Sequence, residues 1–236
     1  MNDIKTVAAT LLLCSCGALI FVCSLALQKR STSGAAAIFL ALSGLCVVFY
    51  DFGYAMEIFA VTLHDVLFWV RFEHLGIQLI PVLWLMFTLS IMGKKKFVTL
   101  RLGLLLFLPP LVALVCSQTL GGLNLMHPNP RLADSDSLSL FAYDRGWVMY
   151  LVTAVQSLYI AASILLLTVG LIRGSPLPRK QTVIYWAGSL LPWASSLAFN
   201  FGKVPYNIDT TPLVLSLSIA LLMIGFLGEG LLETKI

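Results

Sequence analysis

The sequence predicts an all-α integral membrane protein, a bundle of seven transmembrane helices. Of its 236 residues, 59% are hydrophobic and only 11% are charged, whereas soluble domains carry about 25% charged residues. The apolar residues also form long continuous runs, which favours helices over an alternating membrane barrel. Because a helix needs roughly 20 mostly apolar residues to cross a bilayer, residues 1–236 have room for seven crossings within one domain.

The apolar runs define the expected helices in order. The first run lacks a strongly basic leading region and a clear cleavage site, so we interpret it as a retained helix and not as a signal peptide. Pro81, Pro109, Pro110 and Pro192 lie within the runs, and each should kink or locally widen its helix, because proline removes a backbone donor. The last helix should start at the cap formed by 209–212 and continue through Leu232. The spans are expected at approximately 6–27, 35–56, 66–92, 100–117, 147–171, 182–201 and 211–227.

The charges of the connections predict the orientation of the bundle. Lys and Arg in short loops mark the cytoplasmic side of a membrane. The N-terminus is therefore expected outside and the C-terminus in the cytoplasm, in a multi-pass protein of the cell inner (plasma) membrane. The basic connections hold Lys29, Arg30, Lys94, Lys95, Lys96, Arg101, Arg173, Arg179 and Lys180. The opposite set holds fewer basic residues, Lys5, Arg131, Arg145 and Lys203, and is rich in acidic ones, Asp3, Glu57, Asp65, Asp134, Asp136, Asp144 and Asp209.

Polar residues gather in the outer part of several runs. A charge within the membrane is costly, about 2.5–3.5 kcal/mol at a helix centre, and usually faces the bundle interior or a water-filled cavity. Arg71, His74 and Gln78 share one helix face through their i, i+3, i+7 spacing. Asp51, at a matching depth on the second run, is the expected partner of Arg71. Interfacial positions near the lipid headgroups are the alternative interpretation.

These residues predict a polar pocket that opens to the outside. Glu73 should point instead to a neighbouring helix or to the headgroups. The long connection 118–146 should cover the pocket, and its segment LSLFAY suggests a strand in a short hairpin, with Asn124, His127 and Pro128 at turns. The candidate ligand-binding residues are Asp51, Tyr54, Arg71, His74, Gln78, Trp193 and Asn200.

Several function classes can be argued against from the sequence. The five cysteines lie within apolar runs and are interpreted as small buried hydrophobes. The three histidines lack the spacing of a metal site, so neither a metal nor a cofactor is expected. No nucleophile elbow, His-Glu-x-x-His motif or phosphate loop is present, and we expect no enzyme. The last run has no lysine of the kind that binds retinal, which argues against a rhodopsin-type protein. The net charge of +4 is explained by the basic connections of a membrane protein, so no nucleic-acid partner is expected.

Two stretches resemble a known family, the seven-helix N-terminal sensor region of bacterial histidine kinases. Residues 49–93 are similar to its second and third spans, and residues 191–226 are similar to its last two. His74 stands where the family often has tyrosine. The residues that carry the resemblance are Glu73, Gly76, Pro81, Trp84, Phe87, Pro192, Asn200 and the cap at 209–212, with His127 in the place of a histidine that follows the fourth span.

The resemblance implies an extracytoplasmic sensor joined through its last helix to PAS, kinase or diguanylate cyclase modules. We expect such an output module to be absent from this sequence. An extracytoplasmic small molecule, lipid or peptide would bind in the outer half and displace the last helix. Membrane lipids and a cytoplasmic signalling module would be the partners, and a homodimer stays open. A small membrane transporter or channel is the alternative function, and a structural anchor for cytoplasmic modules is a third.

Overall fold

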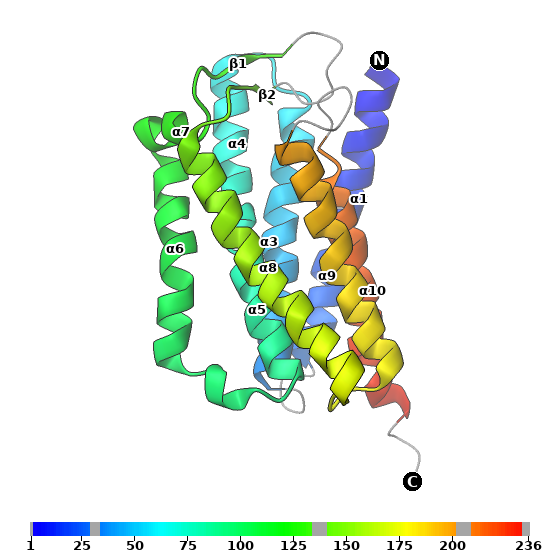
Figure 1. Cartoon of the computed structure of the whole chain (residues 1–236). Coiled ribbons are helices and arrows are strands. Elements are labelled where there is room, and N and C mark those ends of the chain that lie inside the picture. The colour runs from blue at the N-terminus through cyan, green and yellow to red at the C-terminus, as the bar shows by residue number, and fades with distance from the viewer. Residues whose placement is uncertain (1, 29–33, 134–140, 202–208, 233–236) are drawn as a thin grey trace.

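The computed structural model describes residues 2–28, 34–133, 141–201 and 209–232, and these are mostly helical (Figure 1). Each apolar run predicted from the sequence is helical, although the third is divided in two. The elements are α1 (Asn2–Gln28), α3 (Ala35–Glu57), α4 (Leu63–Ile77), α5 (Ile80–Ile91), η1 (Lys95–Phe97), α6 (Leu100–Gln118), α7 (Leu120–Met126), β1 (Arg131–Leu132), β2 (Phe141–Ala142), α8 (Trp147–Arg173), α9 (Arg179–Asn200) and α10 (Thr211–Leu232).

Within the described ranges, five helical segments are long and apolar enough to cross a membrane. They are Asp3–Gln28, Ala35–Glu57, Leu63–Ile91, Arg101–Gln118 and Trp147–Arg173. A shorter apolar stretch, Thr211–Met223, lies in α10, and α9 does not reach the same hydropathy. The fold is therefore that of an all-α, multi-pass membrane protein, while the count of seven crossings and their orientation stay predictions.

The central helix of the bundle is α3, which packs against α1, α4, α5 and α10. The helix α10 also packs against α1 and α9, and α8 lies between α5 and α9. Figure 1 shows the start of α1, the β1–β2 hairpin and α7 at one end of the bundle. The connections α5–α6 and α8–α9 and the end of α10 lie at the other end.

A break at Gln78 and Leu79 separates α4 from α5. Pro81 has no N–H, so the carbonyl of Ile77 loses its usual partner four residues later. The side-chain amide of Gln156 on α8 approaches that carbonyl instead, with Nε2 at 3.5 Å from the oxygen. The kink predicted at Pro81 is thus confirmed, and a neighbouring helix supplies a donor to the freed carbonyl. The prolines of α6 and α9 lie inside continuous helices.

Two glycines bring α3 and α4 close together. A Cβ atom on Gly76 would collide with the backbone carbonyl of Cys46. One to two turns further along, the side chain of Glu73 occupies the space that a Cβ on Gly53 would need. Small residues allow such close approach between membrane helices. Glu73 thus packs against a neighbouring helix, but it also lines a cavity of the bundle, so the prediction that it points away from the pocket is wrong.

The cap of α10 is formed as predicted. The carboxylate oxygen Oδ1 of Asp209 accepts a hydrogen bond from the N–H of Thr211 at 2.9 Å, which satisfies one of the free donors at a helix start. The helix then continues through Leu232, as the sequence predicted.

The long connection before α8 holds more structure than the sequence indicated. Its strands pair antiparallel, with Leu132 opposite Phe141, so the predicted hairpin is present, although residues 134–140 lie outside the described residues. The turn predicted at Asn124 is wrong, because Asn124 lies within α7. Arg145 ties this connection to α9: its Nε donates to the carbonyl of Asn200 at 2.6 Å, which stabilises the end of that helix.

We predict that Gly76→Ala destabilises the protein by about 1–3 kcal/mol or more, because the added methyl group meets backbone that cannot rotate away. Thermal unfolding in detergent measures this change. The matched control is Gly103→Ala in α6, where a Cβ meets no atom within 4 Å, and this variant should unfold at or above the wild-type temperature. Equal stability of the two variants would contradict the close α3–α4 approach.

Candidate functional site

Two adjoining cavities lie within the bundle. The first, here called the polar cavity, has a volume of about 110 Å³ and lies below the hairpin, between α3, α4, α8 and α9. The second, here called the tryptophan cavity, has a volume of about 90 Å³ and is bounded by α5, α8, α9 and the start of α10. The residues that line both cavities are Tyr50, Ile77, Thr153, Gln156 and Ser196.

Three carboxyl groups from separate elements line the polar cavity. Glu57 ends α3, Glu73 lies on α4 and Asp209 precedes α10. Each residue is more than nine-tenths buried. The backbone N–H of Phe141 in β2 donates to Oε1 of Glu57 at 3.0 Å. Oε1 of Glu73 is buried and has no hydrogen-bond partner within the described part of the chain.

Asp209 links the cavity to the last helix. The hydroxyl group of Tyr50 donates to Oδ2 of Asp209, while Oδ1 accepts from the N–H of Thr211. The N–H of Asp209 itself donates to the hydroxyl oxygen of Tyr54 at 3.1 Å. Burial raises the pKa of the Asp209 carboxyl, and the hydrogen bonds from Thr211 and Tyr50 oppose that shift. Two tyrosines of α3 therefore hold the start of α10.

Two histidines form a hydrogen-bonded chain at the cavity wall. Nδ1 of His74 lies 2.7 Å from the carbonyl oxygen of Val70. A carbonyl can only accept, so Nδ1 carries the proton and Nε2 of neutral His74 is an acceptor. Nε2 of His127 lies 3.4 Å from that atom and is the donor to it. Nδ1 of His127 is left as a buried acceptor without a partner in the described residues.

The connection before α8 forms the aromatic roof of the polar cavity. Phe141 and Tyr143 line it together with His127. The ring of Tyr143 packs at an angle against His127 and Phe141, with ring centroids 4.3 Å and 4.7 Å away. Burial raises the pKa of the Tyr143 phenol and lowers that of His127 well below its usual value, with nearby His74 as a second cause. Both groups are therefore neutral near pH 7.

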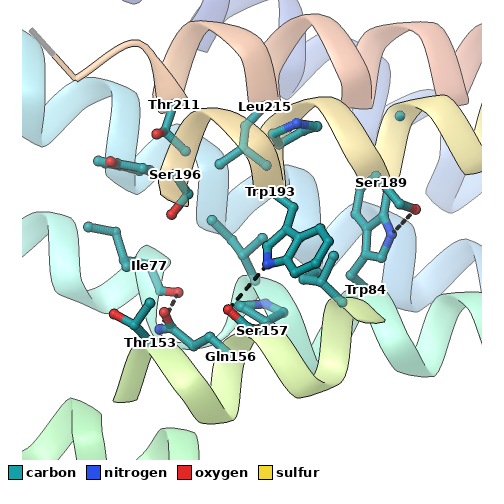
Figure 2. A pocket seen from close by; sticks show the side chains of 16 residues that line it. Ile77, Trp84, Thr153, Gln156, Ser157, Ser189, Trp193, Ser196, Thr211 and Leu215 are labelled. Carbon is teal, nitrogen blue, oxygen red and sulfur yellow. Dashed lines mark hydrogen bonds between the residues drawn. The ribbon is translucent and has the colours of Figure 1, made fainter. Parts of the chain in front are cut away.

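The tryptophan cavity is mostly apolar (Figure 2). The indole N–H of Trp84 donates to Oγ of Ser189 at 2.7 Å, and that of Trp193 donates to Oγ of Ser157 at 3.2 Å. Both indole donors are thus satisfied within the protein. The contact between Gln156 and the Ile77 carbonyl, drawn in Figure 2, lies where the two cavities meet.

Five of the residues predicted as ligand contacts line the cavities. Tyr54, His74, Gln78 and Asn200 belong to the polar cavity, and Trp193 belongs to the tryptophan cavity. Neither Asp51 nor Arg71 is among the residues that line them.

The expected pair of Asp51 and Arg71 is not formed. Asp51 accepts hydrogen bonds from Ser15 of α1 and Ser216 of α10, so its carboxylate faces away from α4. Arg71 offers its backbone carbonyl to Gln118 of α6, and its Nε has no partner among the described residues. The argument from depth failed because equal depth does not place two side chains on facing sides of their helices.

Sequence reasoning missed the acidic character of the site. The i, i+4, i+7 spacing of Tyr50, Tyr54 and Glu57 puts them on one helix face, and all three line the polar cavity, so that spacing held the signal. The sequence predicts Asp209 as a helix cap and an outer acidic residue, and not as part of the cavity. His127 and Tyr143 reach the cavity through the fold of the long connection, which the helical periodicity does not describe.

We predict that His127 makes the protein less stable in mild acid. A histidine whose pKa is lowered by folding stays neutral in the native state while the unfolded chain takes up a proton, so stability falls as the pH drops below about 6.5. The loss of unfolding temperature between pH 7.5 and pH 5.5 should be smaller in His127→Gln than in the wild type. His64→Gln, at an exposed side chain, should show the wild-type loss, and an unchanged loss in His127→Gln would count against the prediction.

Comparison with known proteins agrees with this fold. No curated protein sequence matches the chain significantly. The model of one protein family, described as the N-terminal 7TM region of histidine kinase, matches residues 11–235. This match covers nearly the whole sequence and includes both stretches that carry the resemblance. The chain therefore belongs to the family of N-terminal seven-transmembrane sensor regions of histidine kinases.

Proposed function

We propose that the chain senses a ligand that arrives from outside the cell or within the outer leaflet. The ligand binds in the polar and tryptophan cavities and shifts the arrangement of the helices around them. The last helix carries that shift to a cytoplasmic signalling module. Membership in the family gives the chain a sensor role, and the matched family is a sensor region and not a catalytic module. The chain itself carries out no reaction in this proposal, and a homodimer is compatible with it.

The position of Asp209 is the observation that carries the proposal. This residue lines the polar cavity and also caps α10. A ligand that changes the hydrogen bonds of its carboxyl group acts directly on the first turn of the output helix. A ligand can shift a conformational equilibrium only by its differential affinity for two states, and Asp209 is a group that both the ligand and α10 contact.

The charge of the two ends supports the orientation. The α5–α6 and α8–α9 connections lie at the end opposite the hairpin (Figure 1). Lys94–Lys96 belong to the first connection, and Arg173, Arg179 and Lys180 lie at the helix ends that flank the second. By the positive-inside rule that end is cytoplasmic. The cavities then lie in the outer half of the inner membrane, and the end of α10 reaches the cytoplasm.

We predict that Asp209→Asn uncouples ligand binding from α10. A thermal-shift screen of the purified wild type against amines, carboxylic acids, lipids and peptides provides a stabilising compound. Hydrogen exchange of Thr211–Met223 should then slow in the wild type when that compound is bound. In Asp209→Asn the change should be much smaller, because the amide fills the same space without the charge. Asp3→Asn, at an exposed carboxyl in the first turn of α1, is the matched control and should respond like the wild type.

Two results would contradict the proposal. If exchange within α10 stays constant while a compound stabilises the rest of the bundle, the last helix does not carry the signal. If proteoliposomes that contain the chain show solute or ion flux, the small transporter or channel is the better description.

A further inference from the structure

The polar cavity contains buried acceptors that lack donors. Oε1 of Glu73 and Nδ1 of His127 are buried without a hydrogen-bond partner among the described residues, and both residues line the cavity. Most buried polar groups in native proteins are paired, and an unpaired one is costly. Since both free atoms are acceptors, the missing group is a donor.

The charge of the cavity specifies the charge of that donor. Glu57, Glu73 and Asp209 all line it, and none of the described residues that line either cavity is Lys or Arg. Glu73 and Glu57 are also joined by a side-chain hydrogen bond, which requires one proton between their two carboxyl groups. The pair therefore carries at most one negative charge, and Asp209 lies beside it. Buried charges are normally paired with an opposite charge. An anionic ligand would be repelled, and a cation would be attracted.

We propose that the ligand of this sensor is a small organic amine in its protonated form, with its ammonium group between Glu73 and His127. This inference rests on the proposed function, because it names the chemical class bound at the same site. An ammonium group has three donors and no acceptor, which matches two free acceptors beside a carboxylate. The aromatic rings of Phe141 and Tyr143 lie at the same cavity and suit a cation over their faces.

The tryptophan cavity receives the apolar body of the amine. Its indole N–H groups already donate to Ser189 and Ser157, so the cavity presents mainly apolar surface (Figure 2). Tyr50 and Gln156 line both cavities, so the tryptophan cavity adjoins the polar cavity with its carboxyl groups. A pocket with one charged end and one apolar end fixes the orientation of an amphipathic molecule.

A metal ion fits the observed geometry less well than an amine. Within the described ranges, no group of three or more His, Cys, Asp or Glu side chains is arranged to hold a metal. Nδ1 of His74 is occupied by the Val70 carbonyl, and its Nε2 faces His127. A protein zinc site needs three or four such ligands.

Binding to the purified chain in nanodiscs tests the proposal. The probes are primary amines with alkyl and aromatic bodies of increasing size, 2-phenylethylamine among them. Each amine is paired with the alcohol and the carboxylate of the same body, and methylamine supplies the head group alone. Calorimetry should show that at least one amine binds at least tenfold more tightly than its alcohol, with no binding by its carboxylate and weaker binding by methylamine.

Substitutions place the binding at the cavity. Glu73→Gln should weaken binding of the amine at least tenfold, whereas binding of the neutral alcohol should change little. Glu57→Gln, at the neighbouring carboxyl, is a second variant should Glu73→Gln fail to fold, and it should weaken the amine in the same direction. Asp3→Asn should bind like the wild type.

The possible outcomes separate the amine from the sensor proposal. If alcohols or carboxylates bind better than amines, and Trp193→Ala weakens them, the cavities bind a ligand but the amine class is wrong. If Zn²⁺ stabilises the protein and no amine does, the proposal that the ligand is an amine is likewise wrong. If no compound of any charge binds and every cavity variant behaves like the wild type, the proposed function fails together with this inference.

Discussion

A buried carboxyl group is costly unless hydrogen-bond donors reach it. Asp209 obtains them from the hydroxyl group of Tyr50 and the N–H of Thr211, and it gives its own N–H to Tyr54. These bonds fix the start of α10 against α3. The wall of the polar cavity, the cap of the last helix and the packing of two central helices therefore depend on the same residue.

The helix α3 connects these contacts because each of its faces meets a different neighbour. Asp51 accepts from serines of α1 and α10, whereas Gly53 accommodates Glu73 of α4. Protein interiors are close-packed and transmit small displacements. A shift of α4 against α3 near Glu73 thus reaches α10 by two routes, through the tyrosines that hold Asp209 and through Asp51. The proposed sensing mechanism depends on these contacts of α3 with both α4 and α10.

The sequence predicted those features that local chemistry determines. Continuous apolar runs predicted the long helices, Pro81 predicted the break between α4 and α5, and the Asp209–Pro212 segment predicted a helix start. The rotation of each helix about its axis depends on neighbours that a single sequence does not reveal, which is why the Asp51–Arg71 pair was wrong. The acidic cavity was missed for the same reason, since Glu57, Glu73 and Asp209 lie far apart along the chain and meet only after α3, α4 and α10 have packed.

The modest hydropathy of α9 bears on how the protein enters the membrane. Its polar side chains find partners elsewhere in the bundle, as Ser189 does with Trp84 of α5 and Ser195 with Thr210, just before α10. The sequence predicts that α9 crosses the membrane, and an isolated α9 there would expose these groups to lipid, where they are costly. The translocon would therefore gain little by releasing α9 alone. We expect α9 to be retained beside α8 until α10 has been synthesised, so that insertion of the last helices and their folding are one cooperative event.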